Sequence, residues 1–591
     1  MEQQYELASP ASQTRPPTMR ANEASETPHY DPALHKRTLR KLDWLLLPFL
    51  ALLFLFNSLD KSNIGNAESA HFTSDIGLHK QDLNTAVALF FTFFVTLQPA
   101  GAALGRKYGM VLWVPSCMLL WGISTALHVW VRARWQLYTL RVLIGCLEAG
   151  FYPVTVSYLS LFYTRFEFGR RLSLFYGQSA VGGALGGVIS YAVFRAFPGD
   201  INRDHGEAGD PEVDTKWQSW QVLFLFEGVL TVIVALLGYF WLPHSVDTAW
   251  FLTPEERMYA LERVVWDRGT QIEATSSGQD DLDEAQEQEY NNESRGLLNP
   301  SQSPTITRRG VTDDRGLSPH DIVSAFLSPR IWHILICNIL SAIPVYAFQV
   351  FLPLVLAPFT KTPDPALVNL LTAPPYICGA ITLYLFATYS DRHRIRIVPV
   401  LAGLAVLLVG LTLVVALPTT KSWAIPRYIA LNVLLSGTFI ASPLTVAWIS
   451  GNTPLPGKRA LMLGINGWGN LAGILSAMLF RPKYAASGYI IPFWWTLACV
   501  GAASAGYVLL LRNLMKENER RREILGKWDA EEVEKERLEG RGPLGQEHKI
   551  LHWLLLRLKR IGKFDWATQW LEEAIEGNRE GDERITFIYG L

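Results

Sequence analysis

The chain has 591 residues, of which 49% are apolar and only 18% are charged, and its formal net charge is -1. Soluble chains of this length carry about 25% charged residues and divide into several domains. The composition therefore excludes an ordinary soluble protein and predicts a polytopic membrane protein. The balanced charge gives no indication of nucleic-acid binding. The five cysteines all lie inside apolar runs and are expected to be free thiols.

The first 36 residues are rich in Ser, Thr, Pro and Glu and contain no apolar core. They predict a disordered tail and not a cleavable signal peptide. A basic cluster stands just before the first apolar run and consists of His35, Lys36, Arg37, Arg40 and Lys41. Because positive charge is retained on the cytoplasmic side, this cluster is expected to hold the N-terminus in the cytoplasm.

Twelve apolar runs are long enough to cross a membrane, which takes about 20 residues. They lie at 43–66, 84–105, 110–130, 137–162, 172–196, 220–242, 331–357, 367–389, 397–417, 424–450, 459–480 and 489–511. The even-numbered connections carry most of the Lys and Arg residues, with Arg132 and Arg134 as exceptions. This positive-inside pattern and the even number of spans place both termini in the cytoplasm.

The polar break after the sixth run divides the chain into two halves of six spans. We expect a disordered cytoplasmic tail at 1–36, a six-helix bundle at 37–242, a partly disordered cytoplasmic linker at 243–330, a second six-helix bundle at 331–512 and a cytoplasmic tail at 513–591. In the linker, Thr253 and Pro254 predict the start of a helix. In the last tail, residues 548–562 predict a basic amphipathic helix that lies on the inner leaflet or packs on the bundle.

The first span contains a polar stretch from Asn57 to Asn66 that includes Asp60 and Lys61. Asp60 lies about 24 Å along the helix from Trp44, within a hydrocarbon core about 30 Å thick. Ionisable groups at such depth cost about 2.5–3.5 kcal/mol each and usually face a cavity or a partner. A cavity is one interpretation, and a helix end that has reached the headgroups is the other.

The fourth span holds Arg141 and Glu148, which are seven residues apart. Seven residues are almost two helical turns, so both side chains share one face and lie about 10 Å apart along the axis. A fixed cation near a titratable carboxylate suits a proton-coupled carrier of anions. A structural ion pair between spans is the alternative. Glu227 in the sixth span is a further intramembrane carboxylate, whereas His128 is expected at a membrane interface.

Neutral polar residues occur in other spans. Tyr346 and Gln349 share a face beside Pro344, and Asn466 and Asn470 share a face in the eleventh span. Gln178 lies among the glycines of the fifth span. These side chains could complete a substrate site or could form ordinary interhelical hydrogen bonds.

Two short connections have similar sequences. Gly101-Ala-Ala-Leu-Gly-Arg106-Lys-Tyr-Gly follows the second span, and Tyr389-Ser-Asp391-Arg392-His-Arg-Ile-Arg follows the eighth. Both resemble the signature of the major facilitator superfamily, whose halves are related six-helix bundles. The resemblance implies an inner-gate role for Arg106, Asp391 and Arg392. The first copy departs from the pattern, because Leu104 or Gly105 stands where an acidic residue is expected.

Two further stretches resemble the same superfamily. Arg141-Val-Leu-Ile-Gly-Cys-Leu-Glu148 is similar to its R-x-x-x-G-x-x-E motif. Asp60-Lys-Ser-Asn-Ile-Gly-Asn-Ala67 resembles a stretch of the anion:cation symporter family, as do Phe226-Glu227-Gly228 and Leu242-Pro243. The fungal allantoate-permease-like branch is the most similar, and it includes carriers of nicotinate, pantothenate, biotin, allantoate and small peptides. The resemblance covers roughly residues 35–525.

Together these features predict an all-α membrane protein with twelve transmembrane helices in two six-helix bundles. We expect a secondary active transporter of the plasma membrane, monomeric in the bilayer, that carries a small organic anion with protons by alternating access. The substrate-binding residues are predicted to be Lys61, Asn63, Arg141, Gln178, Tyr346, Gln349 and Asn466. The proton-coupling residues are predicted to be Glu148, Asp60 and Glu227. No cofactor, metal, nucleic acid or enzymatic activity is expected.

Two alternatives stay open. One is an efflux antiporter of the same fold, although no proline follows the glycines of the fifth span as it does in drug:proton antiporters. The other is a nutrient sensor that transports nothing, which the additional tail at 526–591 would suit.

Overall fold

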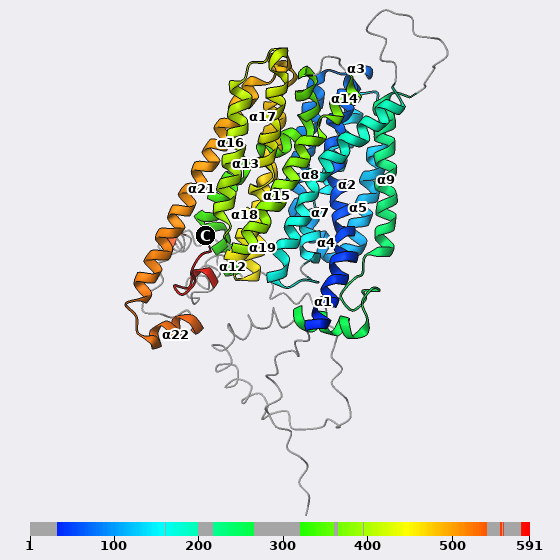
Figure 1. The fold of residues 1–591 in the computed structure, drawn as a ribbon. Helices are drawn as coiled ribbons and strands as arrows, with labels where there is room; N and C mark the ends of the chain where they lie inside the picture. The colour runs from blue at the N-terminus through cyan, green and yellow to red at the C-terminus, as the bar shows by residue number, and fades with distance from the viewer. Residues whose placement is uncertain are drawn as a thin grey trace, which may run out of the picture.

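The computed structural model describes residues 32–159, 161–198, 217–264, 319–359, 364–393, 395–539, 556–557, 560 and 581–590. The predictions for residues 1–31, for the centre of the linker at 265–318 and for most of the amphipathic segment at 548–562 lie outside these residues. Within them the chain forms helices joined by turns and contains no β-strand. The long helices run side by side along one axis (Figure 1).

The first half of the chain begins with α1 (Pro32–Lys41), which continues through a π-helical turn at Leu42–Leu46 into α2 (Leu47–Ser69). The helices that follow are α3 (Phe72–Asp75), α4 (Lys80–Tyr108), α5 (Met110–Ala126), α6 (Arg134–Glu148), α7 (Phe151–Leu159), α8 (Arg165–Ala196) and α9 (Ser219–Trp241). We call α2 to α9 the N-terminal bundle. Its closest pairs of neighbours are α5 with α9, α2 with α8 and α4 with α6.

The second half contains α12 (Pro319–Leu327), α13 (Pro329–Leu356), α14 (Pro365–Leu370), α15 (Ala373–His393), α16 (Ile397–Ala416), α17 (Ala424–Thr438), α18 (Ala441–Asn452), α19 (Pro456–Gly467), α20 (Ala472–Leu479), α21 (Ile490–Leu525) and α22 (Ala530–Glu539). We call α13 to α21 the C-terminal bundle. It packs against the N-terminal bundle through α8 with α15, α2 with α13 and α4 with α20.

Eleven helical segments in the described part of the chain are long and apolar enough to cross a membrane. The predicted span at 459–480 is the remaining pass, and it is not one continuous helix. It consists of α19, a 3-10 turn at Trp468–Leu471 and α20. Gly467 and Gly469 lie at this break, and glycine weakens a helix by about 1 kcal/mol relative to alanine. A Cβ atom at Gly467 would also lie only 3.0 Å from Nε2 of Gln98 on α4.

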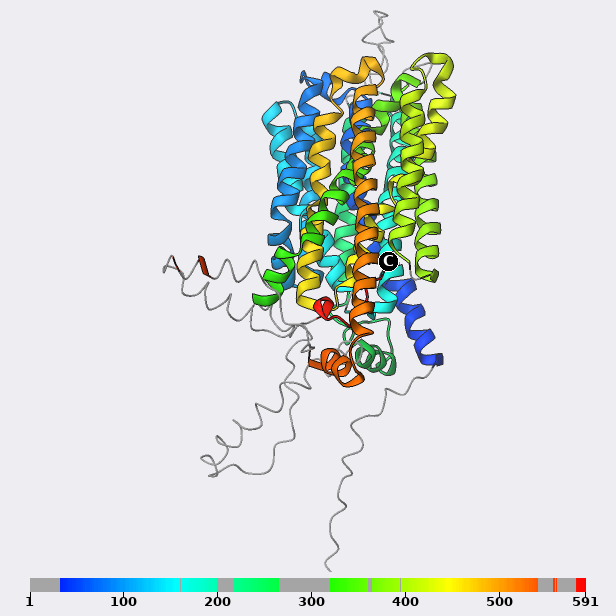
Figure 2. The same cartoon turned by 90° about the vertical axis from the view of Figure 1, so that its left-hand side faces the viewer.

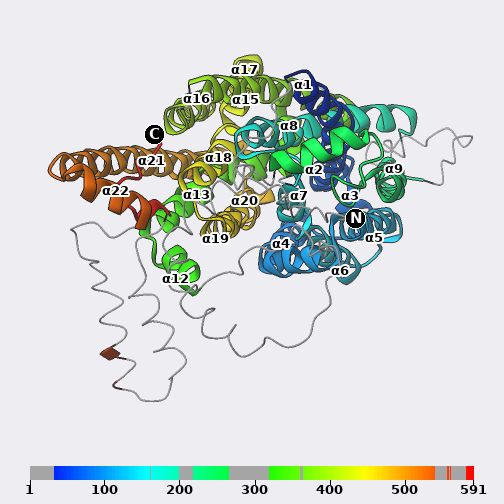
Figure 3. The ribbon, with the colours of Figure 1, turned by 90° about the horizontal axis from the view of Figure 1, so that it is seen from below.

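The two ends of the bundle differ. The end that carries α1, α12 and α22 is called the tail face here, and the end that carries α3 and α14 is called the opposite face (Figures 1 and 2). Helix α21 has 36 residues, or about 54 Å, and therefore projects beyond the other helices at the tail face. Seen along the bundle axis, α21 lies at the edge farthest from the N-terminal bundle (Figure 3).

The tail face of the N-terminal bundle is covered by the helix at 254–264. Its predicted N-cap is confirmed, because the Thr253 hydroxyl accepts from the Glu256 amide at 3.4 Å and the Thr253 amide donates to Glu256 Oε2 at 2.8 Å. Glu256 also forms ion pairs with Lys41 at 2.7 Å and with Arg37 at 3.0 Å. These contacts tie the helix to α1, directly below the first membrane span.

The fourth span breaks at Ala149–Gly150, between α6 and α7. Gly150 faces Gly101 of α4, and a Cβ atom built on Gly150 would lie 2.7 Å from the Gly101 carbonyl carbon. The two backbones can therefore approach this closely only because neither residue has a side chain. Glu148 is the last residue of α6, so this crossing determines where its carboxylate lies.

Candidate functional site

The polar stretch of α2 lies inside the protein. Asp60 is 4% exposed and Asn63 is fully buried, and α2 continues for nine residues beyond Asp60 to Ser69. The stretch therefore contacts neighbouring helices inside the N-terminal bundle, and the helix does not end at Asp60.

Glu148 is the centre of this polar cluster. Its Oε2 atom lies 2.9 Å from Nζ of Lys61 and accepts a hydrogen bond of 2.7 Å from Nδ2 of Asn57. Lys61 also donates to Oδ1 of Asn57. The Glu148 side chain is fully buried and that of Lys61 is 10% exposed. The cluster is thus a buried ion pair braced by an amide that contacts both charges.

Asp60 directly precedes Lys61 in α2. Its Oδ1 atom accepts a hydrogen bond of 2.7 Å from the Thr125 hydroxyl of α5. Its side chain also lies within hydrogen-bond reach of the Glu148 carboxyl group. Asp60 interacts electrostatically with Arg141, Glu148 and Lys61, so two carboxylates and two cations share one site.

Arg141 is 3% exposed and faces three carboxylates, those of Asp60, Glu148 and Glu227. Its guanidinium lies 5.9 Å from the ring centroid of Phe224. Nε and Nη2 of Arg141 have no hydrogen-bond partner in the described part of the chain. A buried donor without a partner costs about 1–3 kcal/mol, so these atoms are suited to receive an anion.

Two other buried groups of the N-terminal bundle also lack hydrogen-bond partners among the described residues. Both side-chain polar atoms of Asn63 and both carboxylate oxygens of Glu227 are unpaired there. His128 Nδ1 lies 2.9 Å from the Ser124 carbonyl, and the ring stacks on Phe224 at 4.8 Å. The His128 side chain is fully buried and lies two residues before the end of its candidate span at Trp130, so an interfacial depth stays a prediction.

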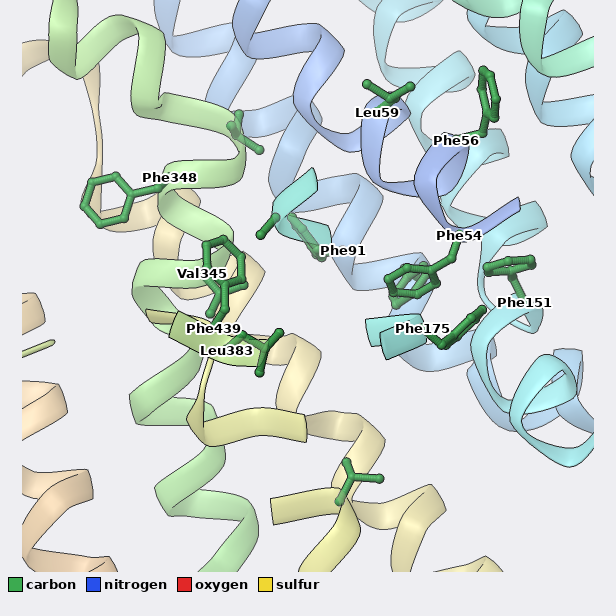
Figure 4. Close-up of a cluster of buried hydrophobic side chains, with 14 of the residues drawn as sticks. Phe54, Phe56, Leu59, Phe91, Phe151, Phe175, Val345, Phe348, Leu383 and Phe439 are labelled. Carbon is green, nitrogen blue, oxygen red and sulfur yellow. The ribbon is translucent and has the colours of Figure 1, made fainter. Parts of the chain in front are cut away.

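An aromatic layer borders this charged cluster. Phe54 of α2, which lies about 9 Å from Asp60 toward the tail face, packs against Phe175 at 4.5 Å and Phe151 at 6.1 Å between ring centroids. Figure 4 shows these three rings converging from α2, α7 and α8. They form an apolar layer beside the charged cluster.

The predicted residues of the C-terminal bundle form neutral pairs. Asn338 donates to Oδ1 of Asn466 at 3.2 Å, and the Tyr346 hydroxyl donates to Asn470. Gln349 donates to the Ser58 carbonyl of α2 at 3.4 Å. These contacts match the interhelical hydrogen bonds weighed as the alternative to substrate contact.

Two contacts connect this neutral layer to the N-terminal bundle. Tyr346 meets Phe91 of α4 with ring centroids 5.1 Å apart, and Gln349 reaches α2. Gln178 is half-buried in α8. The structure therefore brings the charged residues of the N-terminal bundle into one cluster and leaves the neutral residues as separate pairs beside it.

The residues predicted for the inner gate lie apart from this site. Asp391 forms an ion pair with Arg396 of its own connection, while Arg392 is exposed. Arg106 lies in α4, and its side chain is outside the described atoms.

Three residues of the site were not assigned from the sequence: Asn57, Thr125 and His128. Asn57 could have been found, because it precedes Lys61 by four residues and so shares its helix face. Thr125 and His128 carry no comparable signal, because their positions depend on how α5 packs against α2.

Two packed helical bundles with buried charges at membrane depth define a multi-pass membrane transporter. The chain belongs to the Major Facilitator Superfamily, whose family model matches residues 50–454. It is a transporter and not an enzyme.

Curated relatives are transporters from fungi. The chain is 28% identical over 514 residues to the major facilitator-type transporter hxnP of Emericella nidulans, which covers 84% of this chain and 90% of the relative. It is 25% identical over 456 residues to the high-affinity nicotinic acid transporter of Saccharomyces cerevisiae, covering 76% of this chain and 73% of that protein.

Solved structures agree on the fold. The proton:xylose symporter XylE matches with a TM-score of 0.54 at 15% identity, over 80% of this chain and 95% of that one. A bacterial homologue of the human lysosomal transporter Spinster, in an inward-facing conformation, matches with a TM-score of 0.52 at 14% identity, over 82% of this chain and 99% of that one. At these identities the similarity establishes the two-bundle fold alone.

Proposed function

We propose that this protein is a proton-coupled symporter of a small organic anion, of the anion:cation symporter type. The observation that carries the proposal is the buried Lys61–Glu148 ion pair beside Arg141, whose donors lack partners among the described residues. Cations buried in a membrane span are costly unless they serve a partner or a transported ion. An anion that enters the site satisfies Arg141 and competes with Glu148 for Lys61.

Protonation provides the coupling. A proton that binds to Glu148 neutralises the carboxylate and ends its ion pair with Lys61. Lys61 is then available to bind the substrate carboxylate, and Asn57 keeps the neutral carboxyl group in place. Asp60 and Glu227 complete the path by exchanging protons with Glu148 and by balancing Arg141. Binding of the anion and binding of the proton thereby favour each other.

The neutral residues complete the substrate site in this proposal. Asn63, Gln178, Tyr346, Gln349 and Asn466 offer hydrogen bonds to the uncharged part of the substrate. They must exchange their present partners for the substrate, which makes their contribution modest, at about 1 kcal/mol each.

Alternating access moves the two bundles about this midplane site. Hydrogen bonds between the bundles gather near the opposite face, where Asn84 donates to the carbonyls of Ala477 and Phe480 at 2.8 and 2.9 Å. Asn369 donates to Ser69 at 2.7 Å at the same end. These bonds support a state that is closed at the opposite face. With the tail face in the cytoplasm, this is the inward-facing state of a monomer in the plasma membrane.

The substrate class follows from the charges and is supported by one relative. A substrate carboxylate takes the place of Glu148 beside Lys61 and Arg141 once Glu148 is protonated, and the nicotinic acid transporter of Saccharomyces cerevisiae is named for a compound that carries one carboxylate. Pantothenate, biotin, allantoate and small peptides are the other anions of the family that this chain resembles.

The test is uptake in transport-deficient cells at acidic and neutral pH, with labelled nicotinate, pantothenate, biotin, allantoate and a dipeptide. We expect accumulation of one compound, faster in acid and collapsed by a protonophore. The matched control is Arg141→Gln, which should reach the cell surface and accumulate none. The proposal would be refuted if the protein reached the cell surface but took up none of the compounds. It would also be refuted if uptake were unchanged by the protonophore.

A further inference from the structure

Residues 581–590 form a second, separate set of contacts at the tail face. They lie against the ends of α13, α18, α19 and α21, about 120 residues or more away in sequence from three of these four helices. We call residues 581–590 the strap. None of the site residues discussed above takes part in these contacts.

The backbone of the strap is held by side-chain amides. Asn518 of α21 donates to the Tyr589 carbonyl and accepts from the Tyr589 amide, both at 2.9 Å. Asn452 of α18 accepts from the Gly590 amide at 2.7 Å, and Trp448 donates to the Gly590 carbonyl at 2.7 Å. Paired donation and acceptance of this kind fixes both the position and the direction of the segment.

Charged groups hold the other end of the strap. Lys458, the third residue of α19, forms ion pairs with Asp582 at 2.7 Å and Glu583 at 3.2 Å. Arg521 of α21 donates to the Phe587 carbonyl at 2.6 Å. Lys458 is 2% exposed and Arg521 is 4% exposed, so these charges are desolvated and are held by the strap.

Tyr589 sits between two cations. Its ring lies 4.2 Å from the Arg330 guanidinium at the start of α13 and 4.7 Å from that of Arg521. Its side chain is 4% exposed. Cation–π contacts that are shielded from water reach about 2 kcal/mol. The strap therefore joins four helices at one buried point.

The strap joins helices with different places in the bundle. Helices α18 and α19 also contact the N-terminal bundle, through Ser442 with Tyr176 at 3.2 Å and Gly467 with Gln98. Helix α21 lies at the edge farthest from the N-terminal bundle (Figures 1 and 3). The break at Trp468–Leu471 separates α19 from α20, which contacts α4 near the opposite face.

We infer that the strap is an intramolecular latch that holds the tail ends of α18 and α19 back against α21 and so opposes closure of the tail face. Closure requires these ends to move toward α4 and α8, and the docked strap ties them to the far side of their own bundle. Its release permits α19 to turn at the Trp468–Leu471 break. The latch thus favours the state in which the opposite face is closed.

The test is hydrogen exchange of the purified full-length protein, followed by mass spectrometry with no substrate present. In the wild type, the amides of Tyr589 and Gly590 should be protected. In Asn452→Ala/Asn518→Ala they should exchange about tenfold faster or more, because both amides lose their acceptors. The same variant should exchange faster at 80–84 and 477–480 and more slowly at the tail ends of α4 and α8.

A charge exchange keeps the test decisive if the double alanine variant does not fold. Lys458→Glu should release the strap, and Lys458→Glu/Asp582→Lys should restore its protection and the exchange pattern of the bundles. Asn432→Ala, in α17 and away from the strap, is the matched control and should change neither region.

Either of two results would overturn the inference. One is free exchange of Tyr589 and Gly590 in the wild type, which would mean that the strap is not docked. The other is a released strap with unchanged exchange at both faces, which would make it a passive anchor. Because no substrate is used, both outcomes are independent of the proposed transport of an anion.

Discussion

The two bundles share one fold but differ in the chemistry of their middle layers. The described middle layer of the N-terminal bundle holds five carboxylate or cationic side chains, Asp60, Lys61, Arg141, Glu148 and Glu227, and the imidazole of His128. The equivalent layer of the C-terminal bundle holds amides and hydroxyls: Asn338, Tyr346, Asn466 and Asn470. Charged groups need partners held at fixed distances, whereas neutral groups can exchange partners at small cost. The comparison indicates that the N-terminal bundle holds the charges, whereas the C-terminal bundle provides a layer of neutral polar side chains that can change partners.

The largest effect is expected from Lys61→Met. Glu148 would lose its cationic partner, and breaking a buried ion pair costs about 3–5 kcal/mol. Thermal unfolding should occur at a clearly lower temperature, and uptake should be lost. The double variant Lys61→Met/Glu148→Gln should recover stability without recovering uptake. A single variant as stable as the wild type would contradict a buried pair in the N-terminal bundle.

Glu148→Gln tests the coupling alone. The neutral amide can still accept the hydrogen bond from Asn57, so the site should keep its shape, but it can no longer bind and release a proton. Proton-driven accumulation should disappear, while exchange of labelled for unlabelled substrate should continue. Equal loss of accumulation and exchange would assign Glu148 to substrate binding and not to proton transfer.

Asn466→Ala tests the neutral polar layer of the C-terminal bundle. The substitution removes the acceptor of Asn338 and, with it, the hydrogen bond that Asn466 would offer to the substrate. A loss of about 1 kcal/mol of substrate binding corresponds to an increase of about fivefold in KM. The dependence of uptake on pH should stay that of the wild type, in contrast to Glu148→Gln. A changed pH profile would mean that the C-terminal bundle takes part in proton coupling and would break the comparison.

The smallest effect is expected outside the membrane, at Glu256. Burial alone would raise the pKa of this carboxyl, but its hydrogen bonds with Lys41 and with the Thr253 amide lower the pKa below its ordinary value. A lowered folded-state pKa means that the carboxylate stabilises the fold above its unfolded-state pKa. This contribution is lost as the pH falls through the folded-state pKa.

Glu256→Gln should therefore lower stability by about 1 kcal/mol at neutral pH, and the difference from wild type should vanish in acid. Thermal unfolding measured from neutral to acidic pH checks this result. A difference that persists in acid would show that the side chain acts through packing and not through its charge.

The sequence was sufficient to predict a multi-pass helical membrane protein of two bundles, because hydropathy depends only on local composition. It was also sufficient to select the charged residues, since each is exceptional in an apolar span. It could not determine their pairing. Helical spacing places Arg141 and Glu148 on one face, but the ion pair of Glu148 is with Lys61 of another helix.

Two other features were beyond prediction for the same reason. The break between α19 and α20 depends on how closely α4 and α13 approach Gly467 and Gly469. The strap depends on Lys458 meeting Asp582, which lies 124 residues further along the chain. Sequence patterns report contacts within one helix, whereas these features arise from packing between distant segments.

The crossing of Gly101 and Gly150 has a consequence for variation in this chain. Since neither position has room for a methyl group, a library of random substitutions should recover glycine at both sites whenever transport is retained. A substitution at Gly101 or Gly150 would move α6 and so alter the Lys61–Glu148 ion pair, although neither glycine carries a charge or contacts the substrate. Alanine is normally among the mildest replacements in a helix. At Gly101 or Gly150 it should nevertheless be harmful, because the added methyl group has no room.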